Sequence, residues 1–194
     1  MNFKLIFSFL YLLNIIQILS MEYSDQPLKF SLPFKIVKTE DIFINLEVNI
    51  PKGFKQIKTD SKNSKYFIPE IESENNYSQR IVIQDQGSMK FNNWEDIIQN
   101  LYCIDYKHHN SYYTLLEEFK AKRDYYSIAH LAVSYPSDNH QDKRQVLFMK
   151  FFFGQYNCIS LHYIMTLMDD LSELDALELI KEFEKNNIKL TFNK

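Results

Sequence analysis

Glycine is scarce in this sequence: Gly53, Gly87 and Gly154 are the only three, and they lie far apart. Phosphate-binding loops and dinucleotide-binding turns need closely spaced glycines, because the backbone must approach the ligand closely. The turn that presents the serine of many hydrolases needs two glycines in a G-x-S-x-G pattern, which the chain also lacks. The composition therefore excludes these nucleotide-binding and hydrolase motifs, and we expect no cofactor.

The chain also lacks a block of basic residues. Its 22 Lys and Arg residues are scattered among 25 Asp and Glu residues, and the formal net charge is −3. Nucleic-acid-binding domains usually gather basic residues on one face or along one segment. We therefore expect no nucleic-acid partner.

Cysteine is almost absent as well, with Cys103 and Cys158 alone. In an oxidising compartment the two could form a disulfide, which would stabilise the fold by roughly 4 kcal/mol because it closes a long loop. The alternative is that both are small buried apolar residues. The sequence leaves both possibilities open, since it does not show whether the two Cα atoms come within reach.

Only one long apolar run is present, at residues 5–19. It follows Lys4 and ends at Ser20, after which the chain becomes polar. A positive start, an apolar stretch and a small residue at its end are typical of a secretory signal peptide. We therefore predict a periplasmic or secreted protein with a signal peptide at residues 1–20. The alternative is an uncleaved anchor, because the run approaches the ~17–20 residues that span a bilayer.

The rest of the chain predicts one domain at residues 41–194, preceded at 21–40 by a tether or an edge segment. Apolar residues alternate with polar ones or form short β-rich runs in several segments, as in strands of a sheet. The predicted strands are residues 41–50, 66–71, 79–84, 125–135, 145–153 and 155–165. The fold class is therefore α/β (α+β), with an antiparallel sheet of about six or seven strands and packed helices.

Two helices are predicted from apolar residues at helical spacing. The first covers residues 93–102, where Asn93 is a candidate cap and Trp94, Ile97 and Ile98 share one face. The second covers residues 172–186, where Ser172 and Asp175 match the capping-box spacing. Residues 112–119 fit a helical stripe and a strand equally well.

The segment Val48-Asn49-Ile50-Pro51-Lys52-Gly53-Phe54 resembles the early strand and turn of the PsbP-like group, which includes the bacterial envelope protein DcrB. The order of the predicted elements over residues 40–190 is similar to the same group. The resemblance implies a PsbP-like sandwich in which residues 112–119 form a strand. Because the group has no shared catalytic residues, it also implies a binding or assembly role without catalysis.

The best candidate metal ligands are the adjacent His108 and His109, with Asp105 or His140 as a third ligand. Adjacent side chains usually diverge, and no spaced ligand set supports them, so we interpret them as solvated loop residues. We predict no metal site.

Catalytic candidates are equally few. Cys158 could pair with His130 or His162 as a thiol nucleophile, but an apolar strand is not the electropositive setting that such a thiol needs. We interpret His130 as a hydrogen-bonded strand residue. The acidic pairs at 117–118 and 169–170 are interpreted as turn or pre-helix residues. We predict no catalytic residues.

The sequence therefore favours a secreted or periplasmic, non-enzymatic binding or assembly protein of a Gram-negative bacterium. Its partner would be a protein of the envelope or a secretion system, with membrane contact only through an uncleaved N-terminal segment. The alternative is a secreted hydrolase or a metal-dependent virulence enzyme. The polar loop at residues 137–144, which joins two predicted strands, is the first candidate for partner contact.

Overall fold

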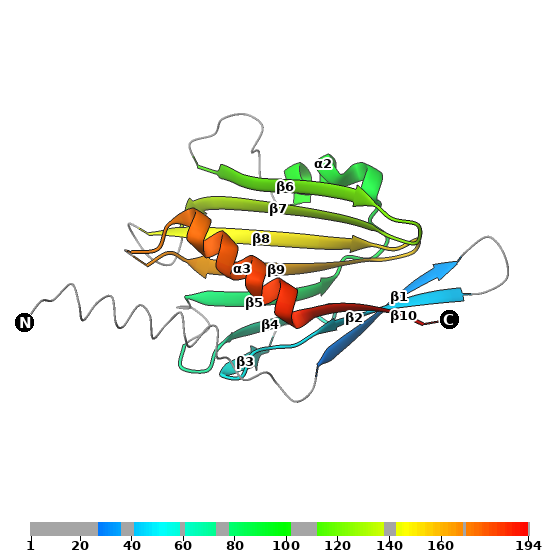
Figure 1. Ribbon diagram of the computed structural model, residues 1–194, viewed down its shortest axis with the longest axis horizontal. Helices are drawn as coiled ribbons and strands as arrows, with labels where there is room; N and C mark the ends of the chain where they lie inside the picture. Colours follow the sequence, from blue (N-terminus) through cyan, green and yellow to red (C-terminus); the bar gives the residue numbers. More distant parts are fainter. Residues whose placement is uncertain are drawn as a thin grey trace, which may run out of the picture.

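The computed structural model describes residues 27–35, 41–58, 61–72, 78–101, 112–137, 143–168 and 170–193. Two antiparallel sheets form the molecule (Figure 1). The larger has seven strands in the order β3-β4-β5-β9-β8-β7-β6, and the smaller has three in the order β1-β2-β10. The predicted fold class is confirmed for the seven-stranded sheet, whereas the separate three-stranded sheet was not predicted.

Five strands of the seven-stranded sheet lie close to predicted segments, whereas the strand at residues 54–57 was not predicted and the strand at 114–122 follows from a segment that was left open between helix and strand. Its strands are β3 (Phe54–Ile57), β4 (Ser64–Pro69), β5 (Gln79–Asp85), β6 (Thr114–Lys122), β7 (Ser127–Pro136), β8 (Arg144–Phe153) and β9 (Cys158–Thr166). Every residue of β9 is buried, because this strand lies at the centre between β5 and β8.

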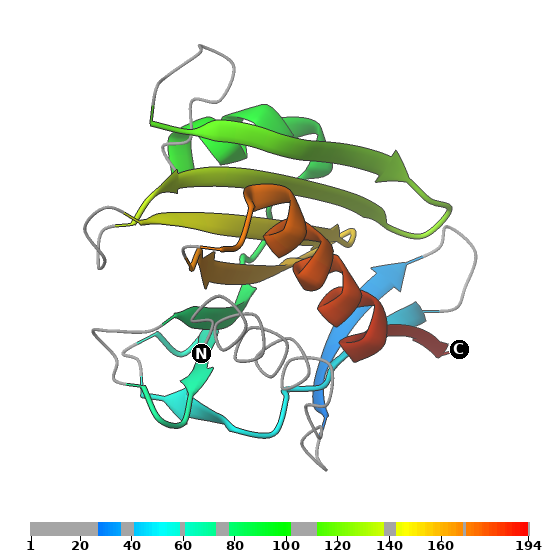
Figure 2. The ribbon, with the colours of Figure 1, turned by 60° about the vertical axis from the view of Figure 1, so that its left-hand side comes forward.

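The seven-stranded sheet has an apolar core on each face, because successive side chains of a strand point to opposite sides. In β8, Val146, Phe148 and Phe152 belong to the core under the helix α3 (Glu173–Asn187). Met149 and Phe151 belong to the core on the other face, where they pack with Trp94. Figure 2 shows α3 crossing one face of the sheet and the short helix α2 on the other.

α3 begins as its sequence predicts. The Ser172 hydroxyl accepts a hydrogen bond from the backbone N–H of Asp175 at 3.2 Å, which satisfies one of the free donors of the first turn. The buried side of the helix carries Ala176, Leu177, Ile180 and Phe183. The chain then passes without a loop into β10 (Ile188–Asn193), which pairs with β2 (Asp41–Val48).

The helix predicted at residues 93–102 is replaced by a segment of mixed geometry. It consists of a 3₁₀ turn η1 (Phe91–Asn93), a three-residue α2 (Trp94–Asp96) and a π-helical η2 (Ile97–Leu101). The prediction that Asn93 caps the segment is wrong, because its side chain makes no capping bond. The predicted buried face is confirmed at Trp94, Ile97 and Ile98.

Residues 112–119 lead into the strand β6, as the resemblance to the PsbP-like group implied. The helical spacing of their apolar residues was misleading. A bulge between Leu115 and Glu117 turns both Leu116 and Glu117 toward the α3 face, so Leu116 and Phe119, three residues apart as in a helical stripe, lie on the same face. Within the predicted tether, residues 28–35 form β1 (Leu28–Lys35), which pairs with β2 at the edge of the small sheet.

Among the described residues, no helix is long and apolar enough to cross a membrane. The predicted signal peptide at residues 1–20 lies outside the described residues, so its cleavage stays a prediction.

Candidate functional site

Four elements meet at one end of the seven-stranded sheet: β7 ends there, β8 begins, β9 ends and α3 begins (Figure 1). We call this region the α3-start end. It contains an open hollow of about 620 Å³. The hollow is lined by Lys143, Arg144, Leu167, Met168, Leu171, Ser172, Glu173 and Leu174.

Arg144 holds the α3-start end together. Its Nε donates to the Glu173 carboxylate at 2.7 Å and to the Ser134 hydroxyl at 2.9 Å, while its Nη2 donates to the Thr114 hydroxyl at 3.2 Å. The buried Ser134 hydroxyl also donates to Glu173. One guanidinium therefore ties the first residue of α3 to β6, β7 and β8, and it fixes the shape of the rim.

Two exposed apolar side chains flank this rim. Met168 is 50% exposed and Leu174 is 64% exposed, although both belong to residue types that are usually buried. The Lys143 ammonium lies 3.8 Å from the Met168 sulfur, so a cationic group borders the apolar surface.

A second exposed surface, formed by aromatic side chains, lies at the same end of the sheet, where β6 begins and β7 ends. The rings of Tyr112, Tyr113 and Tyr135 form a cluster with centroid distances of 4.8, 5.8 and 6.4 Å. Tyr112 and the neighbouring Leu115 are both exposed. The two surfaces flank the base of the 137–144 loop, where the Ser137 N–H donates to the Lys143 carbonyl at 2.8 Å.

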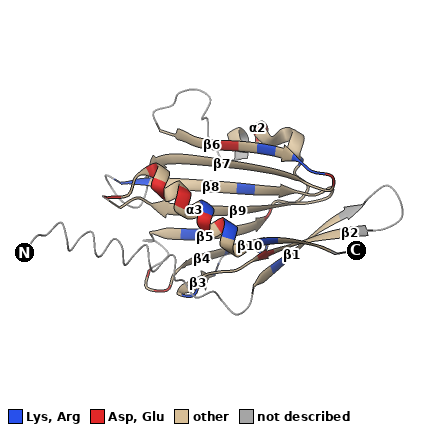
Figure 3. Ribbon diagram, viewed as in Figure 1, with Lys and Arg blue, Asp and Glu red and all other residues tan. Residues whose placement is uncertain are grey.

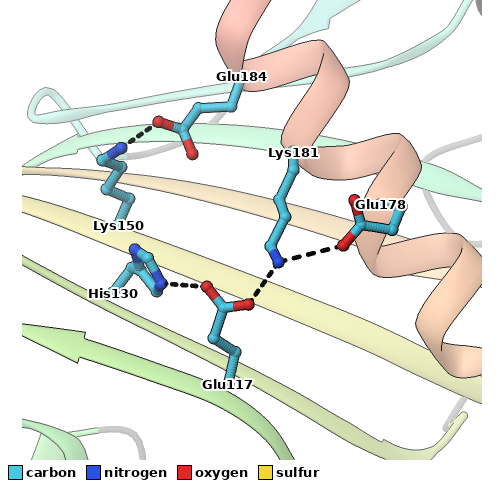
Figure 4. A network of polar contacts seen from close by, with 6 residues as sticks. All are labelled: Glu117, His130, Lys150, Glu178, Lys181 and Glu184. Carbon is cyan, nitrogen blue, oxygen red and sulfur yellow. Dashed lines mark hydrogen bonds and ion pairs between the residues drawn. The ribbon is translucent and has the colours of Figure 1, made fainter.

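A cluster of ionic side chains fixes the middle of α3 on the sheet (Figure 4). Glu117 of β6 bonds Lys181 of α3 at 2.5 Å and the Nε2 of His130 at 2.7 Å. Lys150 of β8 pairs with Glu184, one turn further along α3. We call Glu117, His130, Lys150, Lys181 and Glu184 the ionic cluster; it orients α3 and so places the α3-start end.

Protonation equilibria in the ionic cluster follow from burial and pairing. Burial lowers the pKa of His130 and outweighs the hydrogen bond to Glu117, which would raise it. Burial alone would raise the pKa of Glu117, but the hydrogen bonds from Lys181 and His130 hold it below its usual value. The hydrogen bond to Glu117 raises the pKa of Lys181. The Glu117–Lys181 link is therefore an ion pair at neutral pH.

The interpretation of His130 as a hydrogen-bonded strand residue is confirmed by its 2.7 Å contact with Glu117. Its ring stacks on Phe119 with a centroid distance of 5.1 Å and contacts Phe148 at 5.3 Å. Aromatic rings and one carboxylate thus enclose the His130 side chain, and these contacts are those of a residue that stabilises the fold.

The structure does not bring Cys158 together with either histidine that was considered as its catalytic partner. Cys158 belongs to the core on the α2 face, whereas His130 packs on the α3 face, so the sheet separates them. His162 shares a strand face with Cys158, but four residues of extended strand place them about 13 Å apart. Burial also raises the pKa of the Cys158 thiol, which disfavours the reactive thiolate.

The disulfide stays a prediction. Cys158 has no disulfide partner among the described residues, and Cys103 lies outside them. The same holds for the candidate metal ligands Asp105, His108, His109 and His140. Within the described part of the chain, no three His, Cys, Asp or Glu side chains are grouped as metal ligands would be.

The ionic cluster was missed at the sequence level, although one signal was visible. Lys150 interrupts the apolar run of β8, and a lysine inside a buried strand needs an acidic partner. The partner, Glu184, lies on α3 far along the sequence, and only the packing of α3 identifies it. The acidic pair at 117–118 was interpreted as turn or pre-helix residues, but it lies within β6 and its side chains point to opposite faces.

Comparisons with known proteins find no matching protein-family model and no matching curated protein. Solved structures do match. Cyanobacterial PsbP (CyanoP) from Synechocystis sp. PCC 6803 has 9% identity and a TM-score of 0.51, covering 87% of this chain and 96% of its own. The Ran-binding protein Mog1p from Saccharomyces cerevisiae has 9% identity and a TM-score of 0.50, covering 84% and 96%.

The chain has a Mog1/PsbP-like fold. This confirms the resemblance to the PsbP-like group at the level of architecture. A third match is LpqN from Mycobacterium tuberculosis, described as involved in cell envelope biogenesis, with 13% identity, a TM-score of 0.45 and coverage of 84% and 91%. At such identities a Mog1/PsbP-like fold carries no functional residue from one protein to another.

Proposed function

We propose that this chain is a secreted, non-enzymatic protein-binding module whose docking surface is the α3-start end. The observation that carries the proposal is the exposure of Met168 and Leu174 around a hollow with a cationic rim at Lys143. Exposed apolar side chains bordered by polar groups are typical of protein-interaction sites.

The rigidity of the surroundings supports this assignment. Arg144 bonds residues of three other elements, and the ionic cluster orients α3 along its length. A surface that is fixed before binding loses little conformational freedom when a partner docks. The tyrosines beside the 137–144 loop extend the surface, since tyrosine is enriched in protein interfaces.

The fold is compatible with such a role. Mog1p, which shares the architecture, is described as a Ran-binding protein. The likeness is an analogy at the level of the fold and does not identify the partner of this chain. The secreted location is supported by the apolar run at residues 5–19 behind Lys4, and the predicted partner is a protein of the envelope or a secretion system.

Affinity capture with matched variants tests the docking surface. The exported protein is immobilised as wild type, as the double variant Met168→Ser/Leu174→Ser, and as Tyr156→Ser. Tyr156 is 53% exposed in the β8–β9 turn, at the opposite end of the sheet, and serves as the control. We expect a protein that wild type and Tyr156→Ser both capture and that the double variant loses.

The captured protein is then purified and its affinity for each variant is measured. We expect the double variant to bind at least about tenfold more weakly, because both apolar contacts are removed. Equal affinity of all three proteins would contradict the assignment of the docking surface.

A further inference from the structure

β6 is the outermost strand of the seven-stranded sheet and its longest open edge. None of its nine residues is buried, and on its outer side no described strand pairs with it. An edge strand presents unpaired N–H and C=O groups that can bond another strand. The edge is therefore a candidate surface for strand addition.

The other sheet edges are shorter or interrupted: β10, at one edge of the small sheet, has six residues. β3, at the far side of the same sheet, has only four residues. β1 carries Pro33 within the strand, and proline lacks the N–H that a ladder needs. The bulge of β6 lies near its start, so residues 117–122 form a regular edge.

The charges on this regular half are arranged so that the strand complements itself. Glu118 and Lys120 pair across β7 with Leu131 and Ala129, and both therefore lie on the α2 face. Figure 3 shows the acidic residues of β6 followed by the basic ones. Phe119 lies between them on the α3 face and is 42% exposed.

We propose that β6 pairs antiparallel with β6 of a second copy of this chain, with the twofold axis at Phe119. This register places Glu118 of each copy opposite Lys120 of the other, and it sets the two Phe119 rings side by side. Opposite charges and aromatic pairs directly across a ladder stabilise an antiparallel sheet. A parallel pairing in register would instead oppose like charges.

The pairing uses residues 117–122 of β6, whereas the proposed docking surface reaches only the start of this strand, at Tyr112 and Leu115. The dimer is tested at Lys120 and the docking surface at Met168 and Leu174, so failure of one proposal is distinguishable from failure of the other. A single pair of strands buries less than the roughly 1,200 Å² of a standard interface, so the dimer is weak. We expect it to form at concentrations on the order of tens of micromolar.

Sedimentation velocity of the exported protein between about 1 and 300 µM tests the dimer. We expect wild type to dimerise. Lys120→Glu should dimerise at least about tenfold more weakly, because Glu118 of each copy then lies opposite a glutamate at position 120 of the other copy. Lys189→Glu, which makes the same charge change on the exposed edge of β10, is the charge control and keeps the wild-type affinity. Lys120 also pairs with Glu118 and Glu95 of its own chain at 3.0 and 3.6 Å, so thermal unfolding of Lys120→Glu separates a loss of stability from a loss of dimer.

A mixture of two variants gives a second test. In a dimer of Glu118→Lys, the new lysine lies opposite Lys120 of the other copy, so we expect weak association. An equimolar mixture of Glu118→Lys and Lys120→Glu places opposite charges across the ladder again, and we expect this mixture to dimerise. Glu118 also accepts a bond from the Trp94 indole at 3.0 Å, so thermal unfolding of each variant verifies its fold. If Glu118→Lys unfolds, the comparison of Lys120→Glu with Lys189→Glu decides alone.

Three outcomes would overturn the proposal. The first is a wild type that remains monomeric up to about 300 µM. The second is a dimer that Lys120→Glu leaves as strong as wild type. The third is a mixture of two folded single variants that dimerises no better than either alone.

Discussion

At the scale of single residues, His162 connects the burial of the sheet to pH. It lies in β9 on the α2 face, is buried, and has its ring 5.9 Å from that of Phe151. Burial, reinforced by the positive charge of Arg80, lowers the pKa of His162 to about 3. An unfolded histidine has a pKa near 6.5. Below about pH 6.5 the unfolded chain therefore binds a proton that the folded chain does not, and acid favours unfolding.

We predict that His162 lowers the free energy of unfolding by about 2 kcal/mol between pH 7.5 and pH 5. Urea denaturation of wild type and His162→Gln at the two pH values measures this contribution. The variant should lose less stability on acidification than wild type by about this amount. The remaining loss includes His130, whose lowered pKa acts in the same direction. An equal pH dependence in both proteins would contradict the assignment.

Ile98 is fully buried under the sheet, so Ile98→Ala should lower the free energy of unfolding by roughly 2–4 kcal/mol. Ile71, which is 96% exposed, gives a matched control in which Ile71→Ala changes stability little. Chemical denaturation of both variants checks the prediction. A midpoint unchanged in Ile98→Ala would show that this face is exposed in solution and serves as a contact surface.

At the scale of elements, local pattern and tertiary packing agree for some segments and conflict for others. The Ser172 cap and the apolar side of α3 were predicted, because caps and helical spacing are local properties. The 91–101 segment has the predicted buried residues but not a continuous α-helix. Packing of Trp94 against Phe151 and Phe153 sets its shape, and these contacts are distant in sequence.

The attachment of α3 to the sheet allows a test of the ionic cluster. A double-mutant cycle with Glu117→Gln and Lys181→Met should give a coupling free energy of about 1 kcal/mol, since both side chains are partly buried and share a short contact. The pair Lys29–Glu47 on the small sheet is the control. Lys29 is largely exposed, so we expect its coupling to be within about 0.5 kcal/mol of zero. Equal coupling in the two cycles would contradict an anchoring role for Glu117 and Lys181.

At the scale of the whole molecule, the order of elements was predictable and the second sheet was not. Alternation shows that residues 41–50 form a strand, but it does not identify the strands beside it. Both partners of β2, β1 and β10, also alternate apolar and polar residues, at 28–35 and 188–193, and this strand signal was missed. The α3-start end also depends on elements distant in sequence, so its residues were predicted only at the 137–144 loop.

We predict that the exported protein lacks residues 1–20, because the apolar run ends at Ser20 and the chain becomes polar there. Intact-mass analysis of the protein recovered after export decides the point. A mass that retains residues 1–20, together with recovery in the membrane fraction, would show an anchored protein instead.

The pairing of β2 with β10 has a consequence for how the chain folds. The two strands lie at opposite ends of the domain in sequence, so the small sheet closes only after nearly the whole domain has been synthesised. Because α3 leads into β10 without a loop, the helix that covers the large sheet and the strand that completes the small one arrive together. Closing such a distant contact is slow, since the entropy of the long intervening chain must be lost first. Until that step, β2 exposes an unpaired edge, and the nascent chain stays incompletely folded.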